Sequence, residues 1–131
     1  MIKPDFAKYS LALIKDDEII FSSDKSGLSP LIECVDKYKS KVKDCILHDK
    51  VIGLAAAKII VHSKMISGIA AKICSKPAID LLKKNRIKIT SQIIVDNILN
   101  NDKSNICPME SKAMDFEDNG LFFSEIARGI N

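Results

Sequence analysis

The Cys-Pro-Met-Glu sequence at residues 107–110 holds the residue types best suited to covalent chemistry. Cys107 could act as a nucleophile or a redox thiol, with Glu110 as its proton acceptor. A reactive cysteine needs a thiol pKa lowered by a nearby cation or helix N-terminus. Lys50 or His48 could supply that charge if the fold brings this segment over the helix that follows them. The alternative is that Cys107 and its neighbours anchor a loop on the core, because free cysteines commonly pack as small apolar residues.

A second candidate site surrounds Asp49 and Lys50, which precede the small residues Gly53 and Ala55–Ala57. The spacing predicts a helix from about Asp49 to His62. Asp49 would be its N-cap, and the free N–H groups and dipole of the helix start would favour an anion or a carbonyl oxygen. The alternative is that the small residues only allow close packing of the helix on a sheet, which would offset the roughly 1 kcal/mol that glycine costs inside a helix.

The remaining potential metal ligands do not form a complete set. Cys45 and His48 have a plausible spacing, but two ligands do not close a zinc site, which needs four. We therefore expect neither a metal nor another cofactor. The four cysteines contain no C-x-x-C pair, and the first ten residues lack a long apolar run, which predicts a reduced, cytoplasmic protein.

Length and composition favour a single globular domain comprising residues 1–131, with 47% hydrophobic and 28% charged residues. The net charge of +3 does not by itself indicate a nucleic-acid partner. Two basic groups occur at residues 37–43 and 83–88, but only Tyr38 accompanies them as a stacking aromatic, so we do not expect nucleic-acid binding. No stretch approaches the roughly 18 apolar residues of a membrane span.

The elements that must position these residues alternate along the chain. Two apolar runs within residues 9–24 are split by the polar residues 15–18, which predicts a β-hairpin. Ser29 with Pro30, and Ser75 with Pro77, are typical of helix starts, and Asn85 can end the second helix. Strands are expected at residues 45–47, 65–74 and 87–95, an irregular stretch at 100–120, and a short final helix after it. This order predicts an α/β protein with a mixed sheet.

Two motifs together resemble those of a known family. Asp-Lys-x-x-Gly-x-Ala-Ala-Ala at residues 49–57 and Cys-Pro-Met-Glu at 107–110, after a hairpin and a helix, are similar to a family of small uncharacterised prokaryotic proteins with a cytidine-deaminase-like fold. The resemblance covers about residues 10–112 and leaves 113–131 as a tail with the C-terminal helix. It implies a three-layer α/β/α sandwich with a mixed central sheet.

Zinc deaminases carry His-x-Glu or Cys-x-Glu at one helix start and Pro-Cys-x-x-Cys at the next, and these residues hold and use the metal. Neither residues 48–50 nor residues 51–53 supply the first motif. At the second, Pro77 matches, but Ala78 and Leu81 stand where the thiolates should be. We therefore expect no zinc-dependent deamination.

The sequence thus predicts one pocket, built from two helix starts and the segment at 107–110. Its expected residues are Asp49, Lys50, Gly53, Ser75, Lys76, Cys107, Pro108, Met109 and Glu110. The first hypothesis is that it binds a small polar or nucleotide-like ligand, partly by analogy of fold. Two alternatives stay open, a metal-independent enzyme that uses Cys107 and an oligomeric structural or interaction protein.

Overall fold

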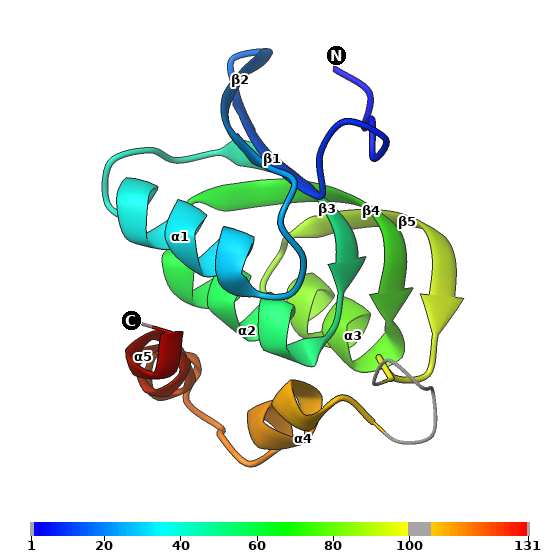
Figure 1. Ribbon diagram of the computed structural model, residues 1–131, viewed down its shortest axis with the longest axis vertical. Coiled ribbons are helices and arrows are strands. Elements are labelled where there is room, and N and C mark those ends of the chain that lie inside the picture. The colour runs from blue at the N-terminus through cyan, green and yellow to red at the C-terminus, as the bar shows by residue number, and fades with distance from the viewer. Residues whose placement is uncertain (1, 100–105, 131) are drawn as a thin grey trace.

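The computed structural model describes residues 2–99 and 106–130 (Figure 1). The described chain forms five strands, β1 (Leu11–Lys15), β2 (Glu18–Ser23), β3 (Cys45–Ile52), β4 (Ile66–Ser75) and β5 (Lys88–Val95). It also forms five helices, α1 (Ser29–Tyr38), α2 (Leu54–Ser63), α3 (Lys76–Lys84), α4 (Pro108–Met114) and α5 (Asn119–Ile130). None of the helices in these described ranges is long and apolar enough to cross a membrane.

The strands make one mixed sheet in the order β2-β1-β3-β4-β5, as expected for an α/β protein. β1 runs antiparallel to both of its neighbours, whereas β3, β4 and β5 are parallel. The predicted hairpin is confirmed, and its turn residues Asp16 and Asp17 both have positive φ, 51° and 62°. Positive φ at both central positions suits the tight turns whose twist matches that of the flanking strands.

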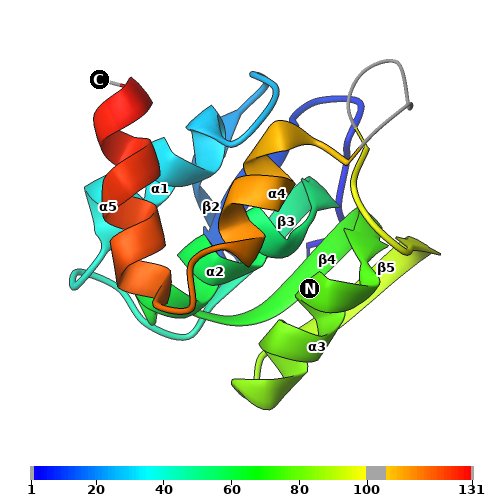
Figure 2. The same cartoon turned by 90° about the horizontal axis from the view of Figure 1, so that it is seen from below.

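The five helices of residues 2–99 and 106–130 lie on one side of the sheet, so the predicted arrangement with helices on both faces is wrong for this part of the chain. α1, α2 and α3 lie side by side against the strands, and α4 and α5 pack on the outer side of α2 (Figures 1 and 2). Successive crossovers move across the sheet in one direction and are right-handed, which places their helices on the same face. On the other face the N-terminal segment contributes Tyr9, whose hydroxyl lies 2.8 Å from Nδ1 of His48.

The core fills the space between the sheet and the helices. Its fully buried side chains include Leu11, Leu13, Leu31, Val35, Leu47, Ile59, Ile60, Leu82 and Phe122. Cys34, Cys45 and Cys74 are buried there as small apolar residues, as expected. Burial raises the thiol pKa of Cys34 to about 12 and that of Cys74 to about 11, which suits a structural role.

The boundaries of three helices differ from the predictions. The helix expected from Asp49 begins only at Leu54, because β3 continues to Ile52 while pairing with β1 on one side and β4 on the other. α1 begins at Ser29, so Leu28 occupies the N-cap position that Ser29 was expected to fill. α4 lies within the stretch expected to be irregular, of which residues 100–105 are outside the described chain.

Candidate functional site

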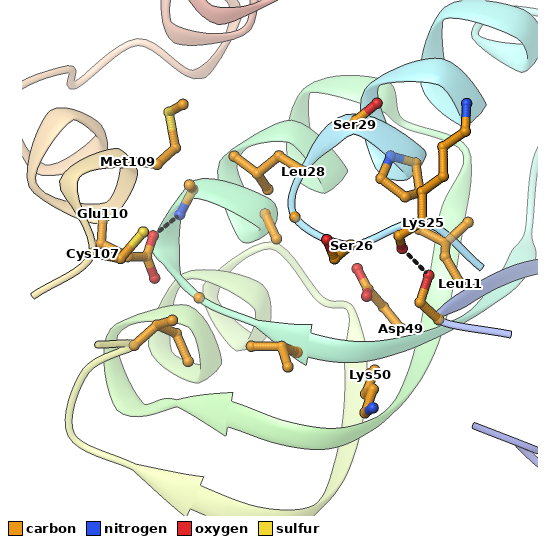
Figure 3. Close-up of a pocket in the computed structure, with 18 of the residues that line it drawn as sticks. Leu11, Lys25, Ser26, Leu28, Ser29, Asp49, Lys50, Cys107, Met109 and Glu110 are labelled. Atoms are coloured by element: carbon orange, nitrogen blue, oxygen red, sulfur yellow. Dashed lines mark hydrogen bonds between the residues drawn. The ribbon is translucent and has the colours of Figure 1, made fainter. Parts of the chain in front are cut away.

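A pocket of about 650 Å³ opens at the carboxyl ends of β2 and β3 (Figure 3). Its walls come from the β2–α1 loop, the start of β1, the end of β3, the first turn of α2, and the segment that begins α4. In open α/β sheets, ligands bind outside the carboxyl ends of the parallel strands. The pocket therefore lies where the topology of this sheet favours a binding site.

The lining combines an apolar wall with several polar groups. The apolar part includes Leu11, Leu28, Pro30, Val51, Ala55, Ala56, Ile98 and Met109. The polar part includes Ser10, Asp24, Lys25, Ser26, Ser29, Asp49, Lys50, Cys107 and Glu110. A mainly apolar cavity with a few converging polar groups is the usual composition of a small-molecule site.

Asp49 is a half-buried acidic group on the pocket wall. It lies on β3 between Leu11 of β1 and Ala71 of β4, and its carboxyl group points toward the β2–α1 loop (Figure 3). Burial raises its pKa from 3.8 to about 8, although backbone N–H groups of Val51 and Lys50 partly oppose the shift. Within the described residues, no lysine or arginine forms an ion pair with it.

Glu110 is buried at the first turn of α2 and caps that helix from a distant part of the chain. Its Oε1 accepts a hydrogen bond of 2.8 Å from the N–H of Leu54, and its Oε2 one of 2.6 Å from the N–H of Ala55. Burial raises the pKa of Glu110, and the two N–H groups oppose the shift. Both carboxylate oxygens are therefore engaged by α2, and neither contacts the Cys107 thiol in a hydrogen bond that would make Glu110 its base.

Gly53 gives Glu110 the room to reach the helix. A Cβ atom at Gly53 would lie 1.5 Å from Oε1 of Glu110 and 2.7 Å from Cγ1 of Ile98. Gly53 is also the N-cap residue of α2 and supplies no side-chain cap of its own. The glycine that the sequence suggested as a helix-face residue is thus a site of close approach for a remote carboxylate.

Cys107 is half-buried and lies on the pocket wall at the N-cap of α4. Its N–H donates to the carbonyl oxygen of Ile98 at 2.9 Å, and its own carbonyl accepts from the N–H groups of Glu110 and Ser111. These backbone bonds fix the turn before α4 and so place Glu110 against α2. The arrangement leaves the thiol beside the pocket, where a ligand could meet it.

The structure brings together six of the nine residues expected at the site, namely Asp49, Lys50, Gly53, Cys107, Met109 and Glu110. It separates Ser75, Lys76 and Pro108 from the pocket lining. Ser75 caps α3 by accepting from the N–H of Ala78 at 3.4 Å, and Lys76 forms an exposed ion pair of 2.9 Å with Asp96. The start of α3 is therefore not part of this pocket.

The β2–α1 loop, residues 24–28, is the part of the pocket that the sequence did not suggest. Its signal was a short polar run, Asp-Lys-Ser-Gly, between a strand and a helix. Such runs occur in ordinary turns as well as in binding loops. Gly27 has a φ of 77°, which favours glycine, so the loop needs it for its backbone path.

The residues at the zinc-ligand positions of the deaminases do not fit a metal. Ala78 is buried in the first turn of α3 and Leu81 follows it in that helix, so neither position offers a donor atom. Cys45 and His48 lie three residues apart on β3, which directs their side chains to opposite faces of the sheet. The described chain has no cluster of three or more potential ligands that could hold a metal ion.

Comparison with known proteins identifies a family. The model of a family described as a domain of unknown function (DUF1893) matches residues 5–128. The chain is similar to a crystal structure of a DUF1893 family protein from Thermotoga maritima, with a TM-score of 0.84 and 24% sequence identity over 94% of this chain and 82% of that chain. None of the curated proteins compared with the chain matches it.

Proposed function

We propose that this chain, which belongs to the DUF1893 family, binds a small nucleotide-like ligand in the pocket at the carboxyl ends of β2 and β3. The half-buried carboxyl group of Asp49, which lines the pocket and points toward the β2–α1 loop, carries the proposal. Enclosing a carboxyl group without a counter-ion costs free energy, and such groups occur preferentially at functional sites. A ligand that shares a hydrogen bond with Asp49 would recover part of that cost.

The rest of the pocket defines the class of ligand. The apolar wall, which includes Leu28, Val51 and Met109, can hold a flat ring against carbon atoms. Lys25 is exposed in the β2–α1 loop and can attract a phosphate or carboxylate group. Lys50 follows Asp49 in β3, so its side chain points to the other side of the sheet and only its backbone borders the pocket (Figure 3). The carboxyl group of Asp49 would then form hydrogen bonds with the polar atoms at the edge of the ring. The volume of about 650 Å³ is within the range of small-molecule sites.

The resemblance to proteins with a cytidine-deaminase-like fold also favours a nucleotide-like ligand, by analogy of fold alone. This resemblance does not extend to the residues that hold zinc in the deaminases. With Ala78 and Leu81 at the metal positions, the proposal includes no zinc-dependent deamination.

A thermal-shift screen of nucleosides, nucleotides and small phosphorylated metabolites tests the proposal. A ligand at 100 times its Kd should stabilise the wild-type chain by about 2.7 kcal/mol and raise its melting temperature. Asp49→Asn and Lys25→Ala should reduce the shift, whereas Asp36→Asn, at an exposed position of α1, should leave it unchanged. If no compound shifts the wild type, or if all three variants shift as the wild type does, the pocket is not a site for these ligands.

The pH dependence of stability tests the observation on which the proposal rests. Because the pKa of Asp49 rises from 3.8 to about 8 on folding, the folded chain keeps a proton that the unfolded chain releases. This group's contribution to the unfolding free energy is complete below about pH 4 and is lost as the pH rises through about 8. Asp49→Asn should therefore stabilise the chain more at pH 8 than at pH 4. An effect of Asp49→Asn that is equal at the two pH values would contradict a raised pKa of the Asp49 carboxyl group.

The alternative of a thiol enzyme rests on Cys107, which lines the same pocket. A faster alkylation of Cys107 than of the other three cysteines would not identify a nucleophile, because those three are buried. The informative comparison is with free cysteine at neutral pH, since a nucleophilic thiol reacts faster than the free amino acid. Faster reaction would favour the enzyme, and equal or slower reaction would leave Cys107 as part of the pocket wall.

A further inference from the structure

We propose that two copies of this chain associate through β5, which pairs antiparallel with the β5 strand of a second copy and joins the two sheets. β5 is the last strand in the sheet order, and it lies outermost in the molecule (Figure 1). In the described chain no other strand pairs with its outer edge. A free edge presents unpaired N–H and C=O groups that form a template for another strand.

Exposed apolar side chains mark this edge. Ile93 and Ile94 retain 46% and 56% of their exposure, and as neighbours in a strand they point to opposite faces of the sheet. The six residues between Lys88 and Val95 carry no charge, so this segment lacks the charges that usually protect an edge strand. The opposite edge, β2, also exposes an isoleucine, Ile19, but it begins with Glu18 directly after the acidic turn of Asp16 and Asp17.

The sequence of β5 is complementary to itself in one antiparallel register, centred on Gln92. In that register, continued to the residue after Val95, the end of β5, Lys88 lies opposite Asp96 of the partner subunit, and the same pair forms again at the other end. Thr90 lies opposite the partner's Ile94 on one face, and Ser91 lies opposite the partner's Ile93 on the other. Pairs that include β-branched residues and pairs of opposite charge stabilise neighbouring strands.

This complementarity favours a second copy over an unrelated strand. A twofold interface requires that the same surface serve both subunits, which the order of polar and apolar residues in β5 satisfies. Asp96 is 82% exposed and contacts Lys76 of its own chain through Oδ1, so its carboxylate lies beside the edge. Lys88 would add a second cation to this acidic group from across the interface.

Sedimentation of the purified chain tests the association directly. The wild type should sediment at twice the mass of the 14.5 kDa chain. Ile94→Asp should convert it to a monomer, because a charge would be buried opposite Thr90, whereas Ile19→Asp, at a similarly exposed position of β2, should leave the dimer intact. A wild type that stays monomeric, or a dimer that both variants disturb equally, would overturn the proposal.

Charge exchange tests the register, with circular dichroism as the control for folding. Lys88→Glu places two acidic groups opposite each other at both ends and should weaken dimerisation by about tenfold or more. Adding Asp96→Lys to that variant reverses both charges and should restore most of the affinity. If the double variant dimerises no better than Lys88→Glu alone, the Lys88–Asp96 register is wrong.

Discussion

The helices α2 and α3 both begin at the carboxyl end of a parallel strand, yet their first turns are stabilised in different ways. α3 carries its own cap, because Ser75 accepts from the N–H of Ala78 three residues later. α2 has Gly53 at the N-cap, and the acceptors for its first N–H groups come from Glu110, which is 56 residues beyond Leu54.

The cap of α3 is a neighbouring residue and can be found in the local sequence, whereas the cap of α2 comes from a distant part of the chain. The first N–H groups of any helix need acceptors, and either a neighbouring side chain or a distant one can supply them. Because the acceptor of α2 lies on α4, the packing of α4 and the stability of α2 are coupled. The same contact borders the pocket, whereas the start of α3 lies outside it. The remote cap is therefore also part of the candidate site.

Gly53→Ala should have the largest effect of the changes that test this comparison. Its Cβ would overlap Oε1 of Glu110, so the carboxylate must leave or the backbone must move. We expect a loss of about 3 kcal/mol in the free energy of unfolding, at the upper end for overpacking. Urea unfolding followed by circular dichroism suits a chain without tryptophan. Gly68→Ala is the matched control, since its Cβ would meet only the end of the Ile46 side chain at 3.0 Å.

Glu110→Ala should come next. It leaves two N–H groups at the start of α2 without their acceptor, which we expect to cost about 2 kcal/mol. Ser111→Ala, at the adjacent exposed position of α4, should change stability little. Equal losses in the two variants would show that the remote carboxylate is not what stabilises α2.

Combining these substitutions should show that they are coupled. With Glu110 replaced by alanine, much of the space that a Cβ at Gly53 requires becomes vacant. The double variant Gly53→Ala/Glu110→Ala should therefore be more stable than the sum of the single losses predicts, by about 1–2 kcal/mol. Additive losses would mean that the glycine serves a purpose other than admitting Glu110.

Ser75→Ala should have the smallest effect. It removes a single acceptor at 3.4 Å, a long hydrogen bond, from the start of α3. We expect a loss of about 1 kcal/mol or less, typical of a local cap. Ligand binding should stay unchanged, because Ser75 is not on the pocket wall. A loss that matches Glu110→Ala would remove the distinction between the two helix starts.

Features whose causes lie within a few residues could be predicted from the amino-acid sequence. Polar residues 15–18 between two apolar runs produce the β1–β2 hairpin. Ser75 and Pro77 begin α3, and Asn85 is its C-cap, as expected. The mixed sheet also followed from the order of apolar segments. Turn and cap preferences act through neighbouring atoms, so they leave a readable local pattern.

Three features depend on the whole fold: where β3 ends, which face of the sheet the helices cover, and what Glu110 contacts. Asp49 has the residue type and position of a helix N-cap, but pairing with Leu11 of β1 and Ala71 of β4 keeps it in a strand and turns it into a pocket residue. Glu110 looked like a proton acceptor for Cys107 and instead caps α2. Strand pairing and remote capping join residues that are dozens of positions apart. The free energy that these contacts contribute therefore depends on the assembled sheet and helices. It cannot be predicted from any local stretch of the sequence.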